Sequence, residues 1–149
     1  YIDMVCLYCG SKTKITNSRY NKELHKTWRR HRCANCNSIF TTYESIDMPQ
    51  TVMVKKRSGK LEPFYEYKLF TSIKKSIDHI SQPAKNANML VQSVLRLVYH
   101  DLNGPVVTTL DLDRYVASVL KRFNAAAAVK YLSYKSNMQL PKDVKKVLF

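Results

Sequence analysis

No stretch of the 149-residue sequence approaches the roughly 20 consecutive apolar residues that a membrane-spanning helix needs. The region near Tyr1 also lacks the apolar segment that is typical of a signal peptide. The Gly-x-x-x-x-Gly-Lys-Ser/Thr loop of many ATP-hydrolysing enzymes is missing as well. A membrane protein and a P-loop ATPase are therefore disfavoured, and we expect a cytoplasmic protein.

Acidic residues are scarce. The chain has 11 Asp and Glu residues against 25 Lys and Arg residues, so its formal net charge is +14. Residues 1–46 hold eight basic and three acidic side chains (+5), and the remainder holds 17 and eight (+9). This excess favours a polyanionic partner, namely nucleic acid, nucleotide phosphates or an anionic membrane surface, of which the membrane is the least favoured.

Cysteine is confined to one short region. The four cysteines form two Cys-x-x-Cys pairs, Cys6 with Cys9 and Cys33 with Cys36, separated by 23 residues. Two such pairs are the ligand set of a zinc ribbon, and four thiolates leave no open coordination position for chemistry. We therefore predict one structural Zn²⁺ per chain. Two disulfides or a thioredoxin-like redox pair are the alternatives, although a redox pair would need only one Cys-x-x-Cys. Reduced cysteines fit the cytoplasm.

The cysteine distribution predicts two domains, residues 1–46 and residues 47–149. The first is too small to bury much apolar surface, so we expect a bound metal to stabilise its fold. Strands are predicted at 12–19 and 38–43, with Ile15, Phe40 and Tyr43 as a miniature core.

The second domain is predicted to be α+β, with about four helices packed on a three-stranded sheet. A linker at 45–50 precedes strands at 51–56 and 61–64, which are joined by a tight turn at Ser58-Gly59. Helical periodicity then begins at Glu66. The remaining elements are a helix at 86–100, a strand at 106–108, a helix capped by Thr109 that buries Phe123 among others, and an alanine-rich helix from 125 to about 136.

A basic run with one aromatic residue leads into the second cysteine pair. Arginines held on a metal-tied scaffold suit contacts with DNA phosphates and guanine edges, although most charge runs are simply solvated faces. Trp28 either stacks on a base or covers the small core. The candidate DNA-binding residues are Arg19, Trp28, Arg29, Arg30, His31 and Arg32.

A second group of cations surrounds the predicted turn in the second domain. Val54, Lys56 and Arg57 precede this turn, Glu62 follows it, and Lys68 lies in the first turn of the next helix. A helix N-terminus offers free N–H groups and the positive end of a dipole. The pattern therefore indicates a phosphate site, while lysines at strand ends are commonly just solvated.

Several motifs in this order resemble the NrdR family of bacterial transcriptional repressors of ribonucleotide reductase genes. They are the two cysteine pairs, Arg29-Arg30, the Phe40-Thr41-Thr42-Tyr43-Glu44 segment, Lys56-Arg57-x-Gly59-x-x-Glu62-Pro63-Phe64 and Lys68-Leu69. The resemblance covers nearly the whole chain and implies an N-terminal zinc ribbon for DNA followed by an ATP-cone.

The resemblance also implies the effectors and partners. ATP or dATP would bind the ATP-cone and change the assembly of a homo-oligomer, which would align its ribbons on a double-stranded operator in the bacterial nucleoid. By resemblance, the nucleotide-binding residues are Val54, Lys56, Arg57, Glu62, Lys68, Lys130 and Tyr131.

Two other functions are open to this sequence. An enzyme is disfavoured because the chain has no room for a reductase barrel, no spare cysteines for thiyl chemistry and only four scattered histidines. The other alternative is a nonspecific nucleic-acid-binding ribbon with a dimerisation domain, which would show steep salt dependence and little sequence preference.

Overall fold

The computed structural model describes residues 3–135. The chain divides into two compact units, and the boundary lies between Ile46 and Asp47. Within residues 3–135, none of the helices combines the length and the apolar character that a bilayer crossing requires. The predicted end of the last helix near Ser136 and the basic C-terminal residues lie outside the described residues.

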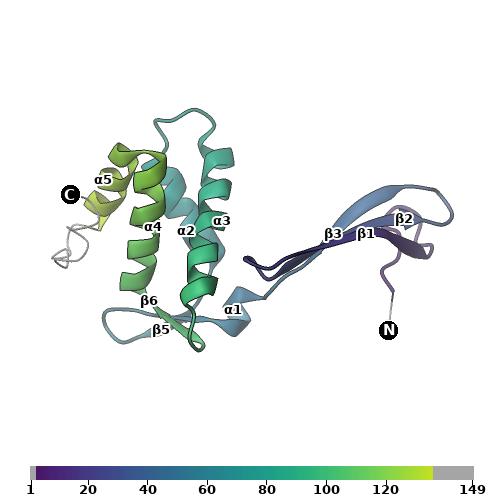
Figure 1. The fold of residues 1–149 in the computed structure, drawn as a ribbon, viewed down its shortest axis with the longest axis horizontal. Helices are drawn as coiled ribbons and strands as arrows, with labels where there is room; N and C mark the ends of the chain where they lie inside the picture. The colour runs from purple at the N-terminus through teal and green to yellow at the C-terminus, as the bar shows by residue number, and fades with distance from the viewer. Residues whose placement is uncertain (1–2, 136–149) are drawn as a thin grey trace. The chain divides into compact units, whose positions relative to one another are not determined.

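The first unit is a three-stranded antiparallel sheet (Figure 1). Its strands are β1 (Thr13–Asn21), β2 (Lys26–Cys33) and β3 (Ile39–Glu44), in the order β1-β2-β3. The central strand β2 carries the basic run and pairs with both neighbours, so Arg19 lies opposite Trp28 and Arg30 lies opposite Thr41. The predicted hairpin is thus present, with a register irregularity between Ile15 and Asn17.

The predicted miniature core of this unit is wrong for Ile15 and Tyr43, while Phe40 is half-buried and stacks on His31. Ile15 is 55% exposed and Tyr43 is 60% exposed, whereas Cys6, Cys33 and His31 are buried. The physical reason is that the unit has a single sheet and no second layer to cover it, so apolar side chains on its strands have little to pack against. The cysteine cluster occupies the interior instead.

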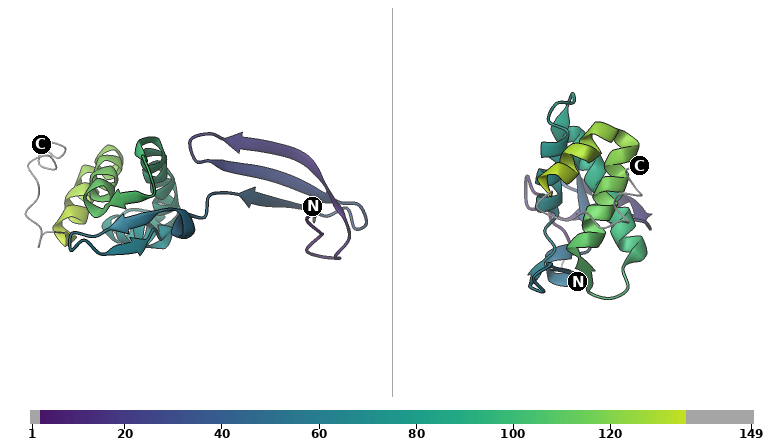
Figure 2. Two further views of the ribbon diagram at one scale, coloured as in Figure 1. Left: turned by 90° about the horizontal axis from the view of Figure 1, so that it is seen from below. Right: turned by 90° about the vertical axis from the view of Figure 1, so that its left-hand side faces the viewer.

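The second unit contains both helices and strands, as predicted. Its elements are α1 (Met48–Thr51), β4 (Met53–Lys55), β5 (Leu61–Pro63), α2 (Glu66–Ser76), α3 (Pro83–Asp101), β6 (Val106–Thr108), α4 (Thr109–Phe123) and α5 (Ala125–Tyr134). The small sheet has the order β5-β4-β6, with β4 antiparallel to β5 and parallel to β6. The helices α2 to α5 lie on one side of this sheet (Figure 2, left).

The helices of this unit enclose its core. The predicted apolar positions Ile73, Ile77, Val94, Val116 and Leu120 are all fully buried. Phe123 was predicted to be buried but is 38% exposed, because it is the last residue of α4, where the helix ends. Packing between successive helices therefore fixes the sheet and the start of α2 relative to α4 and α5.

Three local predictions differ from the structure. The short helix α1 takes in residues 48–50 of the predicted linker and Thr51 of the predicted strand, because Asp47 accepts a hydrogen bond from the N–H of Gln50 and so caps it. Helix α3 begins at Pro83, since proline is favoured in the first helical turn. Helix α4 is capped by Thr108, whose hydroxyl accepts from the N–H of Asp111 at 3.1 Å, and not by Thr109.

Candidate metal centre, basic face and pocket

The four cysteines converge on one point of the first unit. Their Sγ atoms all lie within 4.8 Å of one another, with 3.7 Å between Cys6 and Cys36 and 3.5 Å between Cys9 and Cys33. Zinc bound tetrahedrally at ~2.3 Å from each sulfur holds the sulfurs roughly 3.8 Å apart. All four cysteines are free of disulfide bonds. The donor set therefore fits a structural Zn²⁺ as predicted.

The backbone and nearby hydroxyl groups support these thiols as ligands. The N–H groups of Asn35 and Cys36 point at the Sγ of Cys33, at 3.3 and 3.4 Å. Hydrogen bonds from Ser11, its side chain first, lower the pKa of the Cys9 thiol to about 6. Because zinc binds the thiolate, the lowered pKa of Cys9 favours the metal. Burial and the neighbouring thiols of Cys9 and Cys36 raise the pKa of Cys33 to about 11, so this thiol gives up its proton less readily than Cys9. The bound ion would tie the loop before β1 to the loop after β2, at one end of the sheet.

Strand β2 sorts the basic run onto two faces. Successive side chains of a strand point to opposite sides, so Trp28, Arg30 and Arg32 share one face and Arg29 and His31 share the other. Arg30 and Arg32 are exposed. Cross-strand partners lie on the same face, which adds Arg19 opposite Trp28 and Lys14 opposite Arg32. We call this group, Lys14, Arg19, Trp28, Arg30 and Arg32, the basic face.

The side chains on the other side of β2 make contacts within the protein. The Nη1 atom of Arg29 is 2.6 Å from Oε2 of Glu44. His31 is only 5% exposed, stacks on the Phe40 ring, and lies 2.7 Å from the Thr42 hydroxyl through its Nε2 atom. The prediction that His31 belongs to an exposed basic patch is therefore wrong, because strand alternation turns it inward.

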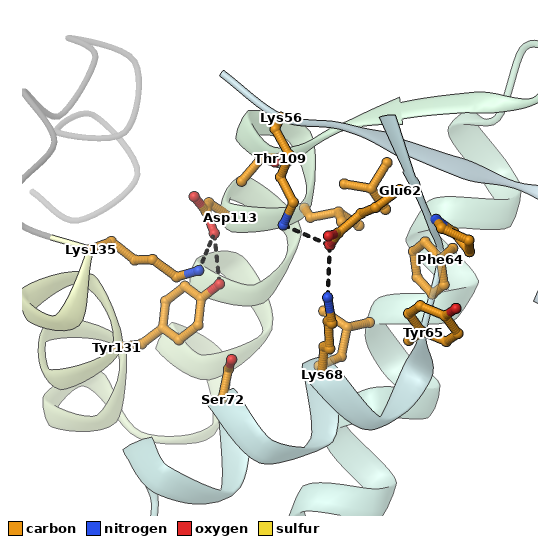
Figure 3. Close-up of a pocket in the computed structure, with 14 residues that line it drawn as sticks. Lys56, Glu62, Phe64, Tyr65, Lys68, Ser72, Thr109, Asp113, Tyr131 and Lys135 are labelled. Atoms are coloured by element: carbon orange, nitrogen blue, oxygen red, sulfur yellow. Dashed lines mark hydrogen bonds and ion pairs between the residues drawn. The ribbon is translucent and has the colours of Figure 1, made fainter. Parts of the chain in front are cut away.

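The second unit contains a small pocket of about 90 Å³ between β4, β5 and helices α2, α4 and α5 (Figure 3). It is partly open to solvent. Its lining combines apolar side chains with lysines and carboxylates. The lining residues are Val54, Lys56, Glu62, Pro63, Phe64, Tyr65, Lys68, Leu69, Ser72, Thr109, Leu112, Asp113, Tyr131 and Lys135.

Two of the lysines meet at one carboxylate of this pocket. The Nζ atoms of Lys56 and Lys68 are 2.7 and 3.0 Å from Oε1 of Glu62. Hydrogen bonds from Lys56 and then Lys68 hold the pKa of Glu62 below its ordinary value, and the bond to Glu62 raises the pKa of Lys68. The Glu62 carboxylate therefore stays ionised at neutral pH and holds the two ammonium groups close together, which favours a ligand with several negative charges.

The structure brings together five of the seven predicted nucleotide-binding residues. Val54, Lys56, Glu62, Lys68 and Tyr131 all line the pocket. The other two do not. Arg57 is exposed in the turn between β4 and β5, and Lys130 points to Asp78 of the loop after α2, with which it forms an ion pair.

Five polar pocket residues were not among the predicted nucleotide-binding residues, namely Tyr65, Ser72, Thr109, Asp113 and Lys135. The Tyr131 hydroxyl donates to Oδ1 of Asp113 at 2.7 Å, and the Nζ of Lys135 is 3.4 Å from the same oxygen. Burial, followed by the Asp113 charge, raises the pKa of Tyr131 far above its ordinary value, so its hydroxyl remains a donor.

A signal for Asp113 was present in the sequence. Residues 113, 116, 117 and 120 fall on one face of a helix at i, i+3, i+4 and i+7. The last three are apolar and fully buried. A carboxylate within an otherwise apolar helical stripe is unusual, and such a residue commonly has a binding or catalytic role.

Comparison with known proteins agrees with this layout. Residues 4–44 match the family model described as "Transcriptional repressor NrdR-like, N-terminal domain", and residues 52–139 match the ATP cone domain. The first match covers the metal site and the basic face, and the second match covers the pocket.

Curated relatives extend the similarity along the chain, and those that follow are named "Transcriptional repressor NrdR". The protein of Methylobacterium radiotolerans is 31% identical over 146 residues, which is 97% of this chain and 81% of the relative. The protein of Thermosipho melanesiensis is 30% identical over 131 residues (87% and 85%), and that of Desulforapulum autotrophicum is 31% identical over 132 residues (87% and 78%). With a zinc-ribbon ligand set, an ATP-cone and full-length similarity to repressors, the chain belongs to the NrdR family of transcriptional regulators, which are not enzymes.

Proposed function

We propose that this protein represses ribonucleotide reductase genes by binding double-stranded operator DNA through its zinc ribbon under the control of ATP and dATP. One observation carries the proposal: a cationic face on a metal-tied sheet and a lysine-lined pocket lie in separate units of one chain. It would act on the bacterial nucleoid in the cytoplasm.

The basic face supports the DNA-binding half. Arg30 and Arg32 are exposed on the central strand, and no ion pair within the described residues ties up either of them. Arginine forms bidentate hydrogen bonds with guanine edges and with phosphates, and Trp28 adds a flat ring to the same face. We keep Arg29 as a secondary candidate, because its partner Glu44 is 70% exposed and a phosphate could compete for the guanidinium.

The pocket supports the nucleotide-sensing half. Lys56 and Lys68 supply two charged ammonium groups at the start of α2, and the N-terminal turn of this helix favours anions. Val54, Phe64 and Leu69 provide apolar surface for a base. Arg57 and Lys130 remain proposed nucleotide-binding residues that would need to reorient, since neither lines the pocket.

Thermodynamic linkage would couple nucleotide binding in the second unit to DNA binding by the ribbon. A nucleotide changes assembly only if it binds one quaternary state more tightly than another. A single ribbon offers few base contacts, so useful affinity requires several ribbons on one operator. We therefore propose that ATP and dATP stabilise different homo-oligomers, and that these differ in how many ribbons engage DNA at once.

Isothermal titration calorimetry of the zinc-loaded protein with ATP and dATP, combined with mass measurement in solution, tests this directly. We expect both nucleotides to bind and the mass distribution to change between them. Absence of binding would reject the sensing half. It would favour a nonspecific nucleic-acid-binding ribbon with a dimerisation domain, which should bind unrelated duplexes equally well.

A further inference from the structure

One carboxylate oxygen in the pocket has no partner. Asp113 is 5% exposed, and its Oδ1 atom receives the Tyr131 hydroxyl and lies near the Lys135 ammonium. Its Oδ2 atom makes no hydrogen bond, and among residues 3–135 it is the one buried side-chain oxygen or nitrogen in this position. Figure 3 shows Asp113 at the pocket wall beside Lys135 and Tyr131.

A buried carboxylate oxygen requires a donor. Nearly all buried polar atoms in native proteins have a hydrogen-bond partner, because a charged group removed from water without one is strongly disfavoured. The neighbouring side chains Tyr131 and Lys135 are already directed at Oδ1. Since Asp113 lines the pocket, a group on the bound ligand is the natural donor for Oδ2.

The charges around Asp113 restrict what this donor is. A phosphate is mostly deprotonated at neutral pH and is repelled by a carboxylate. The ammonium groups of Lys56 and Lys68 are better placed to bind the phosphates. Lys135 lies next to Asp113. The part of a nucleotide that is bonded directly to its phosphates is the sugar, and the sugar carries hydroxyl donors. The base is attached to the other side of the sugar and so lies further from the phosphates.

We propose that Oδ2 of Asp113 accepts a hydrogen bond from a sugar hydroxyl of the bound nucleotide, which makes Asp113 a specificity-determining residue of this pocket. The inference rests on the proposed function, because it assumes that an adenine nucleotide occupies the site. It adds a chemical consequence. The pocket reads the sugar as well as the phosphates, so nucleotides that differ only in their sugar hydroxyls bind with different affinities.

Calorimetry with ATP, dATP and 2′,3′-dideoxy-ATP tests the proposal on the full-length, zinc-loaded protein. The dideoxy nucleotide keeps the base and all phosphates but has no sugar hydroxyl. We expect it to bind at least about tenfold more weakly than the better of ATP and dATP, since a hydrogen bond to a charged acceptor typically contributes a factor of this size or more. We expect Asp113→Asn to reduce this ratio to about threefold or less.

Asp111→Asn is the matched control. It removes one carboxylate from the same helix, but Asp111 does not line the pocket and bonds to the Thr108 hydroxyl instead. This variant should keep the sugar preference of the wild type. An Asp113 variant that still binds the dideoxy nucleotide has a folded site, so that ligand also serves as the folding control. If Asp113→Asn binds nothing, Asp113→Ser takes its place under the same criterion.

The outcomes are distinguishable. Equal affinity of the wild type for all three nucleotides would overturn the inference and leave the nucleotide-sensing function intact. A sugar preference that persists unchanged in the Asp113 variants would overturn it as well. Inosine triphosphate lacks the amino group of adenine. If the Asp113 variants changed only the preference between ATP and inosine triphosphate, the donor would be the base, and the inference would be overturned as well. Failure of every nucleotide to bind the wild type would instead reject the proposed function itself.

Discussion

His31 shows how a single side chain can be misassigned on the basis of its neighbours. It lies in a run of arginines, yet it stacks on Phe40 with ring centroids 5.1 Å apart and approaches the hydroxyls of Thr13 and Thr42. Its contribution is to the stability of a sheet that has almost no other interior. In that respect it resembles a core residue more than a DNA contact.

We expect His31→Ala to lower the free energy of unfolding of the ribbon by about 2 kcal/mol, because it removes a buried ring and two hydrogen-bond partners. Denaturant unfolding with zinc present measures this through the fluorescence of Trp28, the only tryptophan in the chain. Arg32→Ala, on the same strand but exposed, is the control and should change stability little. A His31→Ala ribbon of normal stability that no longer binds DNA would contradict our assignment.

Lys68 is the charged residue of helix α2 that lines the pocket. Its ammonium group faces Glu62 at 3.0 Å and lies at the pocket. We predict that Lys68→Ala weakens ATP and dATP binding about tenfold or more, since it removes a charge-assisted contact. Calorimetry measures this affinity.

Lys74→Ala on the same helix is the matched control for Lys68. Lys74 is exposed near the end of α2 and does not line the pocket. It removes the same charge from the protein, so a general electrostatic effect would appear in both variants. Equal affinities for the two variants would remove Lys68 from the site.

At the scale of elements, the two faces of strand β2 carry different side chains: one is the basic face, and the other makes contacts within the ribbon. Its period of two places Arg30 on the basic face and Arg29 on the face that carries the ion pair with Glu44. The sequence contains this alternation, but a run of four basic residues conceals it. Separating the two faces required the knowledge that β2 is the central strand of the sheet.

We expect Arg30→Ala to weaken operator binding by about 1–3 kcal/mol and to lower the salt dependence of binding by roughly one phosphate contact if Arg30 touches the backbone. Arg29→Ala should weaken it less, because Arg29 first has to leave Glu44. Fluorescence anisotropy over a range of salt concentrations measures both effects. A larger loss for Arg29→Ala would show that DNA contacts the opposite face.

The elements themselves were largely predictable. The apolar spacing in α2, α3 and α4 predicted helices, and the Ser58-Gly59 turn predicted the β4–β5 hairpin, because these signals are local. The pocket was predictable only in part. Lys56 and Lys68 lie on either side of the short strand β5. Asp113 and Lys135 come from α4 and the end of α5, and their meeting depends on helix packing that no local pattern encodes.

At the scale of the whole molecule, the two units have separate sources of stability. The described residues of the ribbon contain no helix, so its order depends on the cysteine cluster, while the second unit has a helical core of its own. Loss of zinc should therefore unfold one unit and spare the other.

Cys33→Ala, or chelation of zinc from the wild type, tests this independence. We expect the Trp28 fluorescence to shift to that of an unfolded chain and DNA binding to disappear. Circular dichroism at 222 nm should change little, because every described helix lies in the second unit. A cysteine variant that still holds one zinc per chain and binds DNA normally would refute the structural role of the metal.

The central claim is that the nucleotide in the second unit controls how the ribbons engage DNA, and the most direct measurement is the affinity for a ribonucleotide reductase promoter from the same genome without nucleotide, with ATP and with dATP. We predict dissociation constants that differ by at least about fivefold among the three conditions, within the usual range of allosteric coupling. The difference should vanish in Lys68→Ala and persist in Lys74→Ala. Identical affinities in all three conditions, with nucleotide binding verified by calorimetry in the same sample, would contradict the account.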